Sequence, residues 1–293
     1  MKTNRVIKIF LASSEELEAD RYRFGNLIRK LDNIYEKRGI RIELFEWEDY
    51  DAAYNGMRKQ DEYNERVRAS DMFLALFHKK AGKFTIEEFN IARKAFDEQA
   101  SPKIYTYIKD LEAGESESRE LAEFKRLMLE ELGHYWCRYS NFDTMQLHFV
   151  LQLQMVEATT PIKVEVKESQ VKIGDSTIAD LNNVPFTSEN TTHKELKSRK
   201  EQLDREIGNA ESGGRRGFFG QRSRTTDEEL ANLRAERESV TEQIERQEKA
   251  LVDTAMSIAR MQGGECSSRM RTAAELFEKG ETGKAEAVLK EDD

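Results

Sequence analysis

Residues 72–92 read MFLALFHKKAGKFTIEEFNIA, and this short stretch combines the two patterns that decide the fold. Its first six residues are all apolar, which is typical of a strand buried on both faces of a sheet. From about Gly82 the apolar residues recur at helical spacing, so a helix follows the strand. The pattern predicts one carboxylate, Glu88, in the first turn of that helix.

Similar apolar runs alternate with helical patterns over the first half of the chain. This alternation predicts an α/β domain with a parallel sheet covered on both faces. The helix after the first run shows apolar spacing from Leu17 to Tyr35, with Gly39 as a stop. Ser13 and Glu16 form a capping-box pattern at its start. The five predicted strands are 6–12, 42–47, 72–77, 104–108 and 134–139.

The second half of the chain has a different pattern. Two alternating runs, 162–167 and 171–178, predict a small β-hairpin, and residues 179–192 are expected to form a loop. From about residue 193, apolar residues at three- and four-residue spacings in a highly charged background predict an α-helical coiled-coil hairpin. The last thirty or so residues resemble one tetratricopeptide-type helix pair. The predicted domains are 1–157, the α/β domain; 158–192, the hairpin and linker; 193–262, the helical hairpin; and 263–293, the helix pair.

The predicted tip of the helical hairpin, residues 213–224, carries four arginines, two phenylalanines and no acidic residue. Interleaved basic and aromatic residues would suit contact with a nucleic acid or a lipid surface. A glycine-rich connection between two helices is the simpler reading, and both stay open from sequence.

Composition narrows the classes of partner. Of 293 residues, 35% are charged and 38% are hydrophobic, and the formal net charge is −9. Such an acidic chain is a poor general binder of nucleic acid or anionic membranes, and we expect neither as a partner. The four histidines and two cysteines lack metal-ligand spacing, so no metal site is expected. The run at 6–12 contains Lys8 and leads into Glu15 and Glu16, which favours a strand over a secretion signal, and hence a cytoplasmic protein.

Polar and aromatic side chains gather where the predicted strands end. The carboxyl ends of neighbouring parallel strands meet at one edge of a sheet, so these residues would line a cleft suited to a nucleotide-like ligand. This cleft has no glycine-rich phosphate loop, because Gly82 stands alone and no GxGxxG occurs. The candidate binding residues are Ser13, Ser14, Trp47, Asp49, Phe77, Lys83 and Phe84.

The order of these motifs resembles the Toll/interleukin-1 receptor (TIR) domain in its bacterial form. The resemblance covers roughly the first half of the chain, and it rests on IFLASS at 9–14, Trp47 before a long loop, Ser70-Asp71 before the third strand, and FTIEEF at 84–89. It implies a flavodoxin-like five-stranded parallel sheet. It also implies that Glu88 is the catalytic residue and that Phe84 occupies an aromatic position that is usually tryptophan.

Enzymatic TIR domains cleave the nicotinamide–ribose bond of NAD, which is then a substrate and not a cofactor. The chemistry fits a lone carboxylate, because nicotinamide leaves as a neutral group and only an oxocarbenium-like ribosyl centre needs stabilising. The resemblance therefore implies an NAD glycohydrolase (NADase) that is activated when protomers assemble through TIR and coiled-coil contacts. It also implies a role in bacterial anti-phage defence.

Several alternatives stay open from sequence. Glu88 would be structural if Thr85-x-x-Glu88 formed a capping box, with the carboxylate on the Thr85 amide. Trp47 would equally suit the core, and Ser13 would equally suit a helix N-cap. The chain would be a non-enzymatic TIR scaffold if the change from tryptophan to Phe84 removed activity. A related nucleoside N-glycosidase, such as a nucleoside deoxyribosyltransferase, would also use a glutamate.

Overall fold

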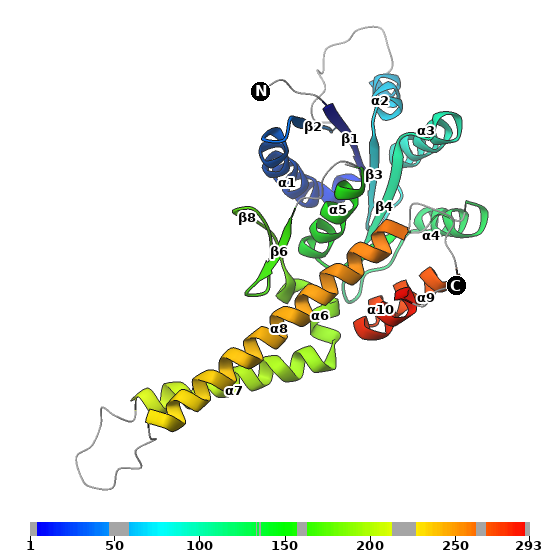
Figure 1. Ribbon diagram of the computed structural model, residues 1–293. Coiled ribbons are helices and arrows are strands. Elements are labelled where there is room, and N and C mark those ends of the chain that lie inside the picture. The colour runs from blue at the N-terminus through cyan, green and yellow to red at the C-terminus, as the bar shows by residue number, and fades with distance from the viewer. Residues whose placement is uncertain are drawn as a thin grey trace. The chain divides into compact units, whose positions relative to one another are not determined.

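The structure is a computed structural model that describes residues 5–46, 59–132, 134, 136–156, 163–212, 227–261 and 268–290. The chain separates into two compact units, Met1–Gln146 and Leu147–Asp293. This division falls inside helix α5 (Phe142–Val156), and each unit has a hydrophobic cluster of its own (Figure 1). Trp47, Asp49 and the predicted tip at 213–224 lie outside the described residues.

The first unit is an α/β unit built on a five-stranded parallel sheet, as predicted, and its strand order is β2-β1-β3-β4-β5. The fifth strand is shorter than the predicted 134–139. Figure 1 shows α1 on one side of this sheet and α2, α3 and α4 on the other. The strands are β1 (Arg5–Ser13), β2 (Ile40–Phe45), β3 (Met72–Phe77), β4 (Lys103–Lys109) and β5 (Cys137–Tyr139). The helices are α1 (Glu18–Glu36), α2 (Lys59–Arg68), α3 (Lys83–Gln99) and α4 (Arg119–Arg126), with short helical turns at η1 (Glu15–Leu17) and η3 (Leu127–Glu131).

The apolar run of β3 matches its place at the centre of the sheet. All six of its side chains are buried, because β1 and β4 flank the strand and helices cover both faces. Phenylalanines from β1, β3 and α3 then pack together: Phe10 stacks on Phe73, and Phe73 meets Phe89 edge-on. Each such buried ring contributes roughly 1.5–3 kcal/mol relative to an exposed one. This cluster fixes α3 against the strand that precedes it.

The boundaries of α1 confirm one prediction and correct another. Gly39 adopts a positive φ of 76° just after the helix, as expected for the predicted stop. The predicted Ser13–Glu16 capping box is wrong, because Ser13 is the last residue of β1 and η1 intervenes before the helix. The helix nevertheless buries the expected apolar face, which includes Phe24, Leu27 and Leu31.

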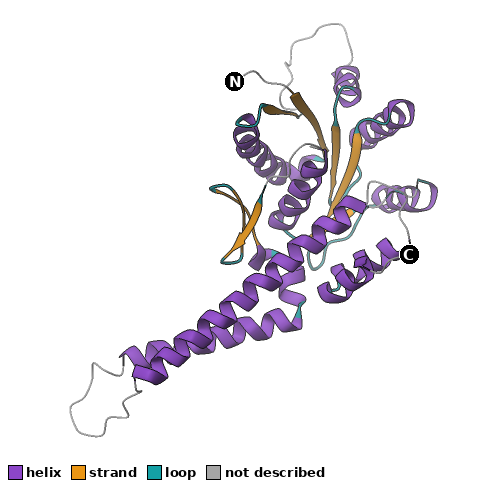
Figure 2. Ribbon diagram, in the orientation of Figure 1, coloured by secondary structure: helices purple, strands orange, loops and turns teal. Residues whose placement is uncertain are grey.

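The second unit contains a three-stranded antiparallel sheet, where a two-stranded hairpin was predicted (Figure 2). The strands are β6 (Val164–Lys167), β7 (Gln170–Ile173) and β8 (Ser176–Asp180). The run 171–178 had been read as one strand, but Gly174 takes a positive φ of 56° and turns the chain within it. Glycine allows that conformation at little cost, so a tight turn fits inside the alternating pattern.

Residues 179–192 are not a loop, contrary to the prediction. They complete β8 and then form η4 (Leu181–Asn183), α6 (Pro185–Glu189) and the start of α7 (Thr191–Ser212). These elements are too short to show a periodic pattern, yet they bury Leu181 and Val184 in the core of the second unit. Asp180 caps η4 by accepting a hydrogen bond from the Asn182 amide at 2.9 Å.

Helix α7 pairs with α8 (Asp227–Met261), as the helical-hairpin prediction requires. Leu203, Val240 and Ile244 form the buried seam between the two helices. The predicted helix pair that follows is α9 (Ser268–Glu278) and α10 (Thr282–Lys290), which turn at Gly280 and contact α8. Within the described ranges, no helix is long and apolar enough to cross a membrane.

Candidate functional site

The strand order of the first unit singles out the edge of the sheet at the carboxyl ends of β1 and β3. The sheet grows from β1 to β2 on one side and from β1 to β3 on the other, so the order reverses between β1 and β3, which lie side by side with Ser13 opposite Leu76. In open α/β sheets, ligands bind in the crevice outside the carboxyl ends of the strands at such a reversal. The predicted residues Ser13 and Ser14 lie at this edge, and so does the loop from His78 to Gly82 that follows β3.

Glu16 links the two sides of this edge. One oxygen of its carboxylate, Oε1, accepts hydrogen bonds from the backbone amides of Lys79 at 3.0 Å and Lys80 at 3.1 Å. The same oxygen accepts a longer bond from the Ser14 hydroxyl at 3.3 Å. These contacts explain why Glu16 caps no helix: its partners lie 63 and 64 residues away in the sequence.

Arg21 of α1 binds the carboxyl end of β1 through hydrogen bonds. Its side chain is buried, with 2% of its surface exposed, and its Nη1 donates to the Ser13 hydroxyl at 2.8 Å and to the Ser14 carbonyl at 2.9 Å. A buried guanidinium needs such acceptors, because an unpaired charge in the interior is costly. Ser13 is therefore held by an arginine and does not cap a helix. Arg21 had not been singled out from sequence.

The loop after β4 is fastened to the same edge by Glu115. Its Oε2 lies 3.0 Å from His78 Nε2 and its Oε1 lies 2.8 Å from Lys79 Nζ. The Lys79 contact and the Glu112 amide lower the pKa of the Glu115 carboxyl. The Ser118 amide also donates to the Lys79 carbonyl at 2.7 Å. The loops after β3 and β4 therefore form one connected rim.

Glu88, the predicted catalytic residue, lies in the second turn of α3 and not in the first. The helix begins at Lys83 with Gly82 as its N-cap, so Thr85 is inside the helix and the predicted Thr85–Glu88 capping box is wrong. The Glu88 Oε1 atom instead accepts a hydrogen bond from Gln60 Nε2 of α2 at 3.1 Å. The Glu88 carboxylate thus faces a neighbouring helix and not its own backbone.

The environment of Glu88 disfavours its charged form. Only 7% of the residue is exposed, and burial raises the pKa of its carboxyl to about 7. The Gln60 hydrogen bond opposes this rise, and the neighbouring Glu87 charge adds to it. No cation contributes to the Glu88 pKa among the described residues. Strongly perturbed carboxyls of this kind are concentrated at functional sites, although structural networks also produce them.

A polar network around Glu88 joins α2 to α3. Asn64 Nδ2 donates to Glu87 Oε1 at 3.1 Å, and Gln60 and Asn64, both buried, lie one helical turn apart. Sequence reasoning missed both of these amides. Their i, i+4 spacing indicated that both amides lie on one face of α2, but nothing in the sequence indicated that this face packs against Glu87 and Glu88.

The other predicted site residues fall into separate environments. Lys83 and Phe84 are exposed at the start of α3, with 58% of Phe84 accessible. The Phe77 ring is fully buried and lies 5.1 Å from the Phe124 ring, so its side chain belongs to the core and is not open to a ligand. Within the described ranges, no hydrogen bond joins Glu88 to Ser13 or Ser14.

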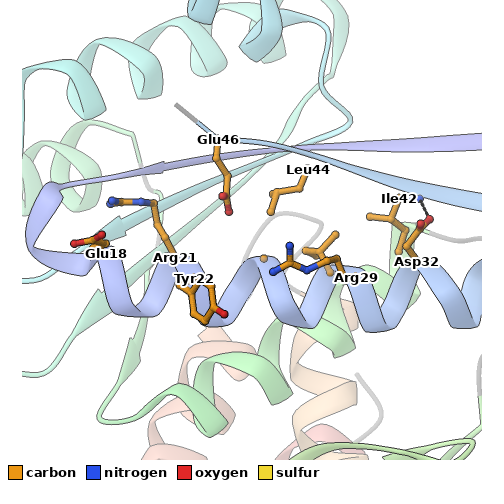
Figure 3. Close-up of a pocket in the computed structure, with 10 residues that line it drawn as sticks. Glu18, Arg21, Tyr22, Arg29, Asp32, Ile42, Leu44 and Glu46 are labelled. Carbon is orange, nitrogen blue, oxygen red and sulfur yellow. Dashed lines mark hydrogen bonds between the residues drawn. The ribbon is translucent and has the colours of Figure 1, made fainter. Parts of the chain in front are cut away.

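A cavity of about 470 Å³ lies between α1 and β2, next to the strand-reversal edge (Figure 3). Arg21 forms part of its wall, so the cavity adjoins the Ser13 contacts described above. Figure 3 shows Glu46 directed from the end of β2 toward α1. The lining mixes both signs of charge with apolar groups and so selects no single class of ligand. It consists of Glu18, Arg21, Tyr22, Gly25, Ile28, Arg29, Asp32, Ile42, Leu44 and Glu46.

Neither a metal-binding group within the described residues nor a related family is found for this chain. In the part of the chain that the structure describes, no group of three or more His, Cys, Asp or Glu side chains is placed to hold a metal ion. The chain matches no protein-family model, and no curated protein is significantly similar to it.

Proposed function

We propose that this chain is a TIR-type NAD glycohydrolase with a flavodoxin-like first unit and Glu88 as its catalytic carboxylate. The observation that carries the proposal is the environment of Glu88. It is a buried carboxylate without a cation among the described residues, on the helix that follows the central strand. A protein that maintains such a group bears a cost in stability, which a function would explain.

The proposed reaction needs what this carboxylate offers. As the nicotinamide–ribose bond of NAD breaks, its electron pair leaves with neutral nicotinamide and positive charge develops on the ribose. A dry carboxylate directed at the ribose stabilises that charge more strongly than water does. Attack of water on the ribosyl carbon then yields ADP-ribose and one proton. The positive charge of NAD would also favour the ionised form of Glu88 and so oppose the effect of burial on its pKa.

Gln60 is the proposed positioning residue. Its amide donates to one Glu88 oxygen and leaves the other oxygen without a hydrogen bond among the described residues. The exposed Phe84, which occupies the aromatic position of the TIR resemblance, would pack on a ring of the substrate. In keeping with that resemblance, we further propose that assembly of protomers activates the enzyme and that it acts in anti-phage defence.

The test is NAD consumption by the full chain, measured over a range of protein concentrations so that assembly can occur. Glu88→Gln keeps the size of the side chain and its contact with Gln60 but removes the charge. We expect turnover to fall by about 10²- to 10³-fold. Glu98→Gln is the matched control, because Glu98 is an exposed carboxylate near the far end of the same helix. Equal turnover by wild type and Glu88→Gln would exclude the assignment.

A non-enzymatic TIR scaffold is the competing proposal. It is favoured by the same burial of Glu88, which leaves only 7% of the residue open to a substrate. It predicts no loss of NAD at any concentration, while self-association continues. Supplying nucleosides in the same assay also tests for a deoxyribosyltransferase, which would consume them and leave NAD intact.

A further inference from the structure

The Glu16 carboxylate accepts hydrogen bonds from a group of donors that would also suit a phosphate oxygen. Two successive backbone amides, those of Lys79 and Lys80, and one hydroxyl, that of Ser14, converge on a single oxygen of the side chain. Successive backbone N–H groups that point at one anion form the concavities in which proteins bind phosphate. Here the anion is a side chain of the protein itself.

The position of this contact is as informative as its donors. Ser14 follows β1, and Lys79 and Lys80 follow β3, so Glu16 spans the reversal point where ligands of such sheets bind. Lys80 and Lys83, exposed on the same loop and at the start of α3, add positive charge there, while the Glu115 carboxylate on His78 and Lys79 adds negative charge. Glu16 itself is exposed, and hydrogen bonds of an exposed carboxylate contribute little to stability. A ligand could therefore replace Glu16 at modest cost.

We propose that Glu16 is an internal competitor for a phosphate-binding site formed by the Lys79 and Lys80 amides. In the ligand-free chain its carboxylate occupies the site, and the phosphate of a bound ligand displaces it. Because only the open fraction of molecules can bind, Glu16 lowers the apparent affinity for every phosphate-bearing ligand. Identifying that phosphate with the diphosphate of NAD rests on the proposed function. The amide site itself does not.

The experiment titrates the full-length protein with inorganic pyrophosphate and follows the backbone amide resonances of Lys79 and Lys80. Glu16→Ala vacates the site, and Glu16→Gln keeps the side chain but removes its charge. We expect both variants to bind pyrophosphate about five- to tenfold more tightly than wild type. Glu15→Ala is the matched control, since it removes the same charge from the neighbouring exposed residue and should bind as wild type does.

Two results would overturn the inference. One is unchanged or weaker pyrophosphate binding by Glu16→Gln, and the other is binding whose resonance shifts fall away from Lys79 and Lys80. A parallel titration with ADP-ribose shows whether a nucleotide diphosphate uses the same amides. The outcome is separable from the NADase assay. Tighter pyrophosphate binding by Glu16→Ala, without NAD turnover by the wild type, would support the phosphate site and reject the NADase proposal. NAD turnover by the wild type, without tighter binding by Glu16→Ala, would support the NADase proposal and reject the phosphate site.

Discussion

Among the described residues, each unit of the chain buries one glutamate almost completely, and the two glutamates have very different surroundings. Glu248 of α8, with 1% of its surface exposed, accepts a hydrogen bond from the Ser169 hydroxyl at 2.7 Å. Its Oε1 also lies 3.6 Å from His193 Nε2 and 4.0 Å from Lys197 Nζ. Glu88 of α3 is bonded to a single neutral amide, that of Gln60.

The two glutamates show how the hydrogen bonds and charges around a buried carboxylate determine the role that it can have. Burial raises the pKa of Glu248, but Ser169 and Lys197 both lower it, so the charge is partly compensated. Burial also lowers the pKa of His193 to about 4, so that imidazole is neutral near pH 7. Glu248 thereby ties the β6–β7 turn to α7 and α8, which is a structural role. Glu88 has the Gln60 hydrogen bond but no cation among the described residues to lower its pKa, which fits the proposed role of its carboxylate.

Truncating Glu248 should have the largest effect on stability. Glu248→Ala removes the acceptor of the Ser169 hydroxyl and the carboxylate nearest the buried His193 ring, and it opens a cavity. We expect the free energy of unfolding to fall by about 2–5 kcal/mol in urea denaturation at pH 7.5. Glu238→Ala, on the exposed surface of the same helix, should change it by less than about 0.5 kcal/mol. Equal effects of the two variants would contradict the structural role of Glu248.

Replacing Glu88 should act in the opposite direction. Its carboxyl titrates near 4.5 in the unfolded chain and near 7 in the folded one, so the unfolded state binds fewer protons between these values. The contribution of Glu88 to the stability of the wild type should therefore decline as pH rises from about 4.5 to 7. Glu88→Gln should remove this decline and raise the free energy of unfolding at pH 8 by up to about 3 kcal/mol.

Denaturation curves of both proteins from pH 4.5 to 8 supply the measurement, and an unchanged pH slope in Glu88→Gln would contradict the raised pKa. The same variant is expected to be inactive as an NADase. A more stable but inactive Glu88→Gln protein would show that loss of turnover does not come from unfolding.

The smallest expected effect concerns Gln60. Gln60→Met keeps the approximate volume but removes the hydrogen bond that lowers the pKa of Glu88. We expect the Glu88 titration midpoint, followed by carboxyl carbon NMR, to rise by about half to one pH unit. A midpoint that stayed constant or fell would show that Gln60 does not stabilise the carboxylate. The titration of Glu248 should not change, because Gln60 is not among the groups that shift its pKa.

Sequence patterns were informative wherever structure is local and repeated. The continuous apolar run of β3 and the helical spacing of α1 both predicted elements that formed. Short elements escaped prediction, as with the turn at Gly174 and the helix α6, because too few residues repeat to reveal a period. Both capping-box predictions failed for another reason. Glu16 and Glu88 each found a donor elsewhere in the fold, and a spacing rule does not register such competitors.

By itself, the sequence determined that the first unit is an α/β structure with a parallel sheet and that a charged helical hairpin follows. Hydrophobic periodicity carries this information, since it reflects which face of each element must leave water. Only the tertiary structure decided the partners of the three carboxylates. Glu16 meets amides 63 and 64 residues away, Glu88 meets an amide 28 residues away, and Glu248 meets a hydroxyl 79 residues away. Hydrogen bonds at such separations depend on how the elements pack, and packing decides which donors each carboxylate meets.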